Sequence, residues 1–140
     1  MNTLLEMGKL SLAAQPFSCY MGVEFESAAV GDVVLSLPVK EEYKQNFGTI
    51  HGGVISYMAD IGLVYAAAST VKDCVTSELK INYVKPAVGD KVIARAKTVA
   101  VGKRQVVCEC RVLTRVNGSD EETLVAIALG TVSRRELEPQ

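Results

Sequence analysis

Length, composition and charge limit the classes of protein to which this chain can belong. It has 140 residues, of which 49% are hydrophobic and 22% are charged, as in a globular domain and unlike a disordered chain. The net charge of -1 argues against binding of nucleic acid through bulk positive charge. We therefore expect one domain over residues 1–140 and no nucleic-acid partner.

Residues 1–16 predict a helical extension packed on the domain. Their apolar residues are spaced as in a short amphipathic helix: Leu4, Leu5, Met7 and Leu10. Charged residues interrupt this run, which excludes the apolar segment of a secretory signal. No stretch reaches the ~20 apolar residues needed to cross a bilayer, since even residues 54–71 contain Asp60. We expect no membrane partner and a cytoplasmic protein.

Two strands are predicted over residues 21–39, on either side of a turn at residues 30–32. Alternating apolar residues indicate one buried face, and Pro38 places the end of the second strand near a sheet edge. A polar, irregular connection follows over residues 41–49. It leads to His51, the only histidine in the chain.

The pattern changes to helical spacing after Val54. Ile55, Met58, Leu63 and Ala66 recur on one face, and the small residues near them allow tight packing. Gly62 falls in the same row, where it weakens a helix by roughly 1 kcal/mol, so we expect the backbone of another element to approach it closely. These features predict a buried central helix.

Four more strands follow this helix. Residues 76–83 alternate, which places Ser77 and Leu79 on one face and Thr76 on the other. Three further strands are predicted near residues 91–101, 104–115 and 122–135, separated by turns at Gly102 and at residues 117–122. Residues 124–129 are apolar at every position, which favours a strand covered on both faces. The predicted fold is α+β, with an antiparallel sheet of five or six strands wrapped around one long central helix.

The four cysteines do not indicate a metal site or a nucleophile. Cys108 and Cys110 are two residues apart in a strand, so both point to one sheet face as core residues. With one histidine and no CxxC motif, a zinc site is not expected. We expect reduced, structural thiols and no cofactor.

The glycine-rich turn and Asp60 have the features of an acyl-transfer site. Gly52 and Gly53 offer backbone N–H groups at the positive end of a helix, with no Cβ to block a carbonyl oxygen. Asp60 is the only charged residue of the apolar helix, and a carboxylate in such surroundings can act as a base towards water. Asp60 lies nine residues after His51, or ~13 Å along a helix axis, so the two cannot meet within one chain. A two-fold dimer, paired through an edge strand over residues 76–83, would bring them together.

The run GTIHGG, the acid nine residues after its histidine, and the later YVKPAVGD resemble the hotdog-fold thioesterase superfamily, in its phenylacetate-pathway-like (PaaI-like) branch. The resemblance extends over residues 17–135. It implies a single hotdog thioesterase domain that hydrolyses aryl- or fatty-acyl-CoA to a free acid and CoA. It also implies active sites at the interfaces of a homodimer, or of a dimer of dimers, and no cofactor besides the CoA of the substrate.

The resemblance assigns roles to single residues. Asp60 matches the general base or nucleophile, and Gly52 the N–H that polarises the thioester carbonyl. His51 organises the turn, Gln45 occupies a position six residues before it, and Thr76 orients water across the interface. The residues expected to bind substrate are Asn46, Gly53, Tyr83, Val84, Lys85, Pro86, Val101, Gly102, Lys103 and Arg104, with the last two near the CoA phosphates.

One combination departs from the family pattern. Family members with Gln at the position of Gln45 more often have Glu at the position of Asp60. This chain combines Gln45 with Asp60, which leaves the choice between base and nucleophile open. Asn46 could replace Gln45 if the loop register shifts by one residue.

Other interpretations of these residues remain. Asp60 could be a structural acid, His51 a helix cap, and the two glycines packing positions. Two other functions also stay open: a hotdog hydratase or dehydratase, and a non-catalytic protein that binds acyl-CoA or another acyl ligand. The aromatic residues Phe47, Tyr57 and Tyr65 could line either an aryl or an alkyl pocket.

Overall fold

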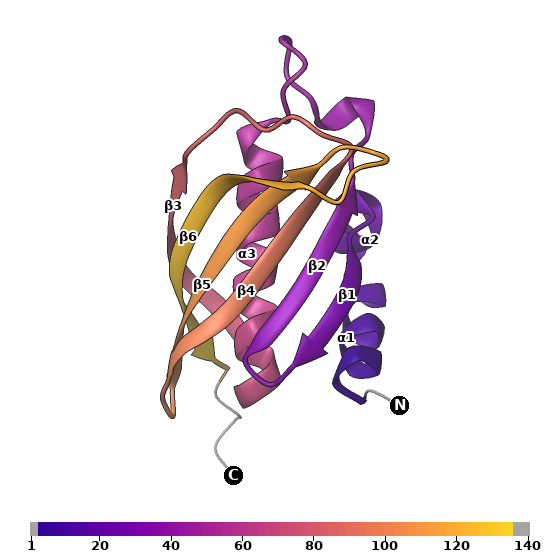
Figure 1. Ribbon diagram of the computed structural model, residues 1–140. Coiled ribbons are helices and arrows are strands. Elements are labelled where there is room, and N and C mark those ends of the chain that lie inside the picture. The colour runs from indigo at the N-terminus through magenta and orange to yellow at the C-terminus, as the bar shows by residue number, and fades with distance from the viewer. Residues whose placement is uncertain (1–2, 136–140) are drawn as a thin grey trace.

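The computed structural model describes residues 3–135 (Figure 1). The elements in chain order are α1 (Thr3–Ala13), α2 (Pro16–Met21), β1 (Glu24–Ala29), β2 (Asp32–Pro38), the 3-10 helix η1 (Glu41–Tyr43), α3 (Gly52–Val71), β3 (Cys74–Tyr83), β4 (Lys91–Val101), β5 (Gln105–Arg115) and β6 (Glu122–Arg134). Both strands predicted before the long helix and all four predicted after it are present.

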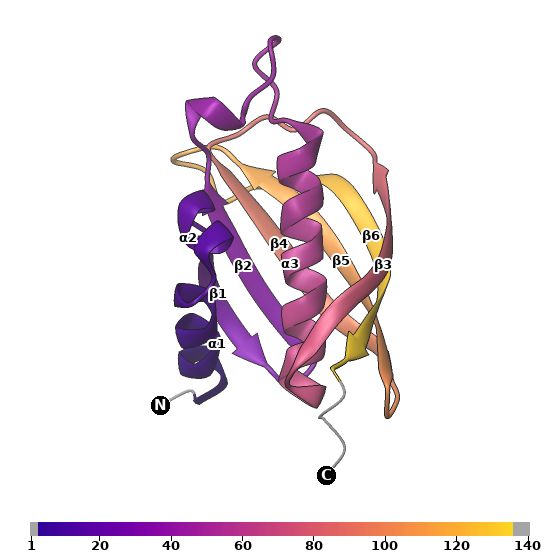
Figure 2. The ribbon, with the colours of Figure 1, turned by 180° about the vertical axis from the view of Figure 1, so that it is seen from behind.

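One antiparallel sheet contains all six strands, in the order β1-β2-β4-β5-β6-β3. The sheet curves around α3, and α1 and α2 lie beside the β1 edge (Figures 1 and 2). The opposite edge is β3. The prediction of an α+β fold, with an antiparallel sheet wrapped around one central helix, is confirmed.

The core lies between α3 and the inner face of the sheet. Met58, Leu63 and Ala66 on α3 are fully buried, as helical spacing predicts. A Cβ built at Gly62 would lie 3.0 Å from the Cys110 Sγ and 3.3 Å from the Ala96 Cβ. The predicted close approach at Gly62 is therefore real, but small side chains approach it and not a second backbone.

The two cysteines of β5 are buried in the core as expected. Cys108 and Cys110 on β5 are fully buried, and both are free thiols. Burial raises the pKa of Cys110 to about 12, and the pKa values of Cys108 and Cys74 to about 11. At neutral pH these thiols are protonated, which makes them poor nucleophiles.

The outer face of β6 is more exposed than its sequence suggests. Val125 and Ala128 face the core, whereas Ile127 and Leu129 are 38% and 53% exposed. The prediction that both faces of this strand are covered is wrong for the single chain. The cause is that α3 covers only the inner face of the sheet.

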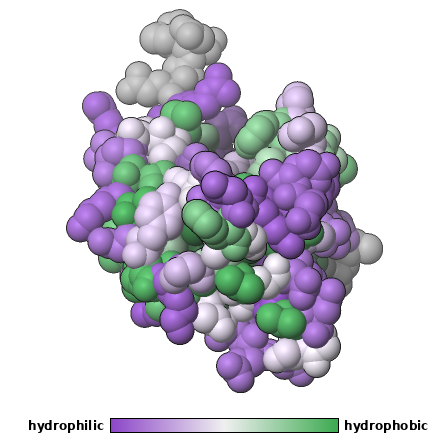
Figure 3. Space-filling view, turned by 90° about the horizontal axis from the view of Figure 1, so that it is seen from above, coloured by the Kyte–Doolittle hydropathy of each residue, from purple (hydrophilic) through white to green (hydrophobic). Residues whose placement is uncertain are grey.

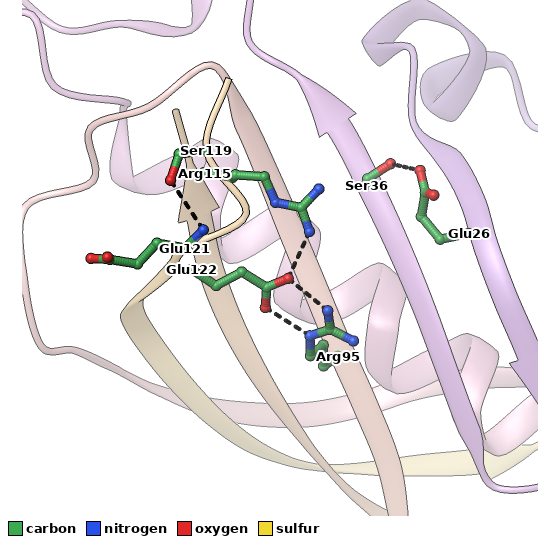
Figure 4. A network of polar contacts seen from close by, with 7 residues as sticks. All are labelled: Glu26, Ser36, Arg95, Arg115, Ser119, Glu121 and Glu122. Carbon is green, nitrogen blue, oxygen red and sulfur yellow. Dashed lines mark hydrogen bonds and ion pairs between the residues drawn. The ribbon is translucent and has the colours of Figure 1, made fainter. Parts of the chain in front are cut away.

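An ion-pair network joins three strands on the sheet (Figure 4). Glu122 on β6 accepts hydrogen bonds from Arg95 on β4, at 2.9 and 2.7 Å, and from Arg115 on β5, at 2.7 Å. The two hydrogen bonds from Arg95, and after them the one from Arg115, lower the pKa of Glu122 to about 2, although partial burial of the carboxylate acts in the opposite direction. The network therefore holds the start of β6 to its neighbouring strands.

By length and mean hydropathy alone, α3 is apolar enough to cross a membrane. The expectation that no stretch of the chain has these properties is wrong by those two measures. The helix is apolar because the sheet wraps around it, and about half of its residues are buried in the core. Its composition is thus explained by packing within the domain.

Candidate active site

The start of α3 is capped by the single histidine. The Gly53 N–H donates a hydrogen bond of 2.8 Å to the Nδ1 of His51, which is the N-cap residue. Two free glycine N–H groups were expected here, but the cap occupies that of Gly53. Within residues 3–135, the Gly52 N–H has no hydrogen-bond acceptor, so one donor is free at the positive end of the helix.

Tyr83, at the end of β3, lies against this turn. Its hydroxyl donates a hydrogen bond of 3.1 Å to the Gly52 carbonyl. A Cβ built at Gly52 would lie 3.5 Å from the Tyr83 ring, which is an ordinary contact distance. The fold itself therefore has room for a small side chain at Gly52.

The loop before the turn forms a small hairpin. Gln45 donates from its backbone N–H to the Thr49 carbonyl and from its side-chain amide to the Thr49 hydroxyl, at 2.8 and 3.0 Å. Asn46 and Phe47 lie exposed on this hairpin, and Phe47 is 89% exposed. Seen from above, this end of the molecule mixes hydrophilic and hydrophobic residues (Figure 3). The contacts of the Gln45 side chain are local, and they do not join it to Asp60.

Asp60 is held by a hydrogen bond from the neighbouring strand. The Thr76 hydroxyl donates to the Asp60 Oδ1 at 2.7 Å, and both residues are half-buried. The strand alternation predicted Thr76 on the face opposite Leu79, and this is wrong. A β-bulge between Thr76 and Glu78 makes Ser77 the extra residue, which turns Thr76 towards α3. The bulge therefore creates the contact with Asp60 within one chain.

Tyr57 lies one helical turn before Asp60. Its ring makes an edge contact with Phe17 of α2, with centroids 5.1 Å apart, and its hydroxyl donates to the Ser18 Oγ at 2.8 Å. Burial raises the pKa of Tyr57, so its phenol stays protonated and acts as a hydrogen-bond donor. Tyr57 thus packs α2 against α3 close to the acid.

The residues predicted to form the site are divided between the two ends of the molecule. The N-terminus of α3, the hairpin with Gln45 and residues 83–86 lie at one end, and the β4–β5 turn lies at the other (Figures 1 and 2). Gly52 and Asp60 are eight residues apart, or about 12 Å along the helix axis. One chain therefore does not bring the free N–H and the acid together.

The β4–β5 turn carries positive charge beside a cavity of about 780 Å³. The cavity is lined by Val101, Gly102, Lys103 and Arg104, as well as by Arg134 of β6. The Arg134 N–H donates to the Arg104 carbonyl at 2.8 Å. Arg134 was not among the predicted site residues, although the paired arginines at the end of the last strand were visible in the sequence. Three cations therefore converge at this end.

Known proteins identify the family. A family model described as the thioesterase superfamily matches residues 47–119. A protein of Saccharolobus solfataricus, named provisionally as an esterase, is 32% identical over 133 residues, which cover 94% of this chain and 85% of that protein. The chain belongs to the thioesterase superfamily. Human acyl-coenzyme A thioesterase 13 is 30% identical over 106 residues, covering 73% of this chain and 76% of the human protein.

Solved structures agree with this assignment. A mutant form of the phenylacetic acid degradation protein PaaI of Thermus thermophilus superposes with a TM-score of 0.75 at 27% identity, covering 86% of this chain and all of the other. The resemblance to hotdog-fold thioesterases and PaaI proteins is confirmed, and with it the hotdog fold class.

Proposed function

We propose that this member of the thioesterase superfamily hydrolyses acyl-CoA thioesters, with aryl or fatty acyl groups, to a carboxylic acid and CoA. The observation that carries the proposal is the Asp60 carboxylate, which is the one charged group of α3 and is fixed by the Thr76 hydroxyl at 2.7 Å. A fixed carboxylate beside an apolar surface suits a reaction in which water attacks a carbonyl. The activity named for the human relative agrees with this class of reaction.

The reaction follows from the two groups. With Asp60 as base, a water molecule attacks the thioester carbonyl carbon while the carboxylate accepts one of its protons. The negative charge on the carbonyl oxygen is stabilised by the Gly52 N–H. The carbon–sulfur bond then breaks, and the proton held by Asp60 passes to the leaving sulfur, which gives the acid and CoA. If Asp60 is instead the nucleophile, it expels the thiolate to form an anhydride, which water cleaves.

The proposal requires a dimer, because one chain separates Gly52 from Asp60. β3 offers ten residues as an edge strand that pairs only with β6 in the described part of this chain. Antiparallel pairing of β3 with the same strand of a second copy would place the end of one subunit that carries the N-terminus of α3 beside the end of the other that carries the β4–β5 turn. Each active site would then combine Asp60 and Thr76 of one subunit with Gly52 of its partner. Two such dimers could assemble further.

The same arrangement would bring together the segments expected to bind CoA. Residues 83–86 of one subunit would approach the β4–β5 turn of the other. There Lys103, Arg104 and Arg134 can attract the CoA phosphates through charge and hydrogen bonds. The proposed enzyme needs no cofactor besides the CoA of its substrate, and we place it in the cytoplasm.

The first experiment is a thiol-release assay with aromatic, short-chain and long-chain acyl-CoAs. The Asp60→Asn variant is expected to lose hydrolysis while keeping its fold and its dimer, because only one oxygen is replaced. Normal turnover by that variant would contradict the proposal. Binding of acyl-CoA by the wild-type protein without turnover would instead indicate a non-catalytic acyl-CoA binding protein.

A mixing experiment tests the shared site. Asp60→Asn and Gly52→Pro subunits, each inactive as a homodimer, are unfolded together, refolded and assayed. Random pairing gives one intact site in half of the dimers, or about a quarter of the wild-type activity. If heterodimers form and no activity returns, the two residues do not belong to sites shared between subunits.

A further inference from the structure

A second cavity lies between the N-terminal helices and the C-terminal half of α3. Its volume is about 430 Å³, within the range of small-molecule binding sites. Leu4, Met7 and Gly8 of α1 form one wall, and Val64 and Ala68 of α3 form the facing wall. Of the three aromatic residues considered for an acyl pocket, Tyr65 lines this cavity, whereas Phe47 and Tyr57 do not.

The cavity is adjacent to the Asp60–Thr76 pair along α3 and β3, although neither of these two residues lines it. Val64 lies one turn after Asp60 on α3, and Cys74 lies two residues before Thr76 on β3, and both line the cavity. The Cys74 thiol donates to the Val64 backbone carbonyl at 3.7 Å, and the Thr76 hydroxyl donates to the Asp60 carboxylate, so both contacts join β3 to α3. The same two elements that hold the acid therefore continue as the wall of the cavity.

The lining selects an apolar ligand. Its floor is formed by apolar residues of β1 and β2, namely Phe25, Ala28 and Val33. The Tyr65 hydroxyl is already bonded to the Ser11 hydroxyl at 3.0 Å and to the Gln15 amide at 2.9 Å. The Ser69 hydroxyl, also in the lining, accepts from the Gly31 N–H and donates to the Ala66 carbonyl, both at 2.7 Å. The uncharged polar side chains of the lining are therefore already paired with protein groups. Its charged residues follow the ends of α3 and β6: Lys72, Asp73 and Arg135.

We propose that this cavity takes the alkyl chain of a fatty acyl group whose thioester lies at Asp60, and that it sets the chain length of the substrate. This inference rests on the proposed thioesterase function. From Asp60 to Lys72, which also lines the cavity, is twelve residues, or about 18 Å along α3. An extended alkyl chain advances about 1.3 Å per bond, so the distance corresponds to roughly 14 carbons.

Variants that fill or enlarge the cavity test this proposal in opposite directions. Ala68→Phe projects a ring into the cavity and is expected to lower kcat/KM for tetradecanoyl-CoA at least about tenfold, while butyryl-CoA changes less than about twofold. Leu4→Ala enlarges the cavity from α1 and is expected to raise the relative kcat/KM for acyl chains longer than about 14 carbons. Ala68→Leu is the milder filling variant if the phenylalanine variant fails to fold.

The matched control is Leu10→Ala, which makes the same change on the same helix at a residue that is 73% exposed and does not line the cavity. It is expected to leave the chain-length profile unchanged. The proposal is overturned if Ala68→Phe lowers all chain lengths equally, if Leu10→Ala and Leu4→Ala act alike, or if the wild-type enzyme prefers butyryl-CoA. Absence of hydrolysis of any acyl-CoA by the wild-type protein would instead reject the thioesterase function itself.

Discussion

The Gly52→Pro substitution removes one N–H group while preserving the start of α3. Gly52 is the first residue of the helix, a position where the N–H has no partner within the helix and where proline is well accepted. His51 before it has φ -60° and ψ 136°, the extended conformation favoured by a residue that precedes proline. Because the Gly52 N–H has no acceptor in residues 3–135, the fold loses no hydrogen bond.

The expected effect is on kcat and not on stability. Loss of one donor to a developing oxyanion lowers kcat by about 10² to 10³. The free energy of unfolding is expected to stay the same or rise by up to about 1 kcal/mol, since proline restricts the unfolded chain. The control is Gly52→Ala, which keeps the N–H and places a Cβ at an ordinary distance from Tyr83, so it is expected to lose at most about tenfold in kcat.

Thiol release under substrate saturation gives kcat, and urea unfolding followed by circular dichroism gives stability. A Gly52→Pro variant that retains kcat within about threefold of wild type would contradict the role of the Gly52 N–H. An alanine variant as inactive as the proline variant would also contradict that role, because steric hindrance and not the missing donor would then explain the loss of activity.

Three further predictions concern single contacts. Thr76→Val removes the hydrogen bond to Asp60 in a side chain of equal shape and is expected to lower kcat about tenfold, whereas Thr76→Ser should retain most activity in the same assay. Glu122→Gln is expected to lower the free energy of unfolding by about 1–2 kcal/mol at pH 7, measured with urea. The folded-state pKa of Glu122 is about 2, below its unfolded value, so the difference between wild type and variant should be full above pH 4.5 and disappear as the pH falls towards 2. Lys72 has φ 63°, a conformation that favours glycine, so Lys72→Gly is expected to raise stability by about 1 kcal/mol, with a melting temperature that does not fall.

Local rules predicted most elements of the fold. The turn between β1 and β2 was predictable because Gly31 adopts φ 72°, which few other residues tolerate. The helical spacing of Ile55, Met58 and Leu63 identified α3, since all three point into one core. The cap at His51 was one of two interpretations of that residue, and its bond to Gly53 depends only on neighbouring residues.

The outer face of the sheet was not predictable in the same way. The sequence of β6 shows that Ile127 and Leu129 are apolar. It does not show whether these side chains are buried by the same chain or lie on a face open to another molecule. An apolar side chain in a strand favours burial, but whether it is buried depends on which helices or sheets pack on that face of the sheet. In the described part of this chain, α3 is the layer that covers the sheet, and it covers the inner face alone.

The contact between Thr76 and Asp60 depends on a feature that strict alternation cannot supply. In a regular strand, Thr76 and Leu79 would face opposite sides, and the hydroxyl would point away from α3. Ser77 adds one residue to β3 opposite β6, so the strand changes face between Thr76 and Glu78. Ser77 is not a glycine or a proline, so nothing in its type marks the bulge. The extra residue places the Thr76 hydroxyl beside the Asp60 carboxylate and Cys74 beside Val64, so the same face of β3 contacts Asp60 and lines the second cavity.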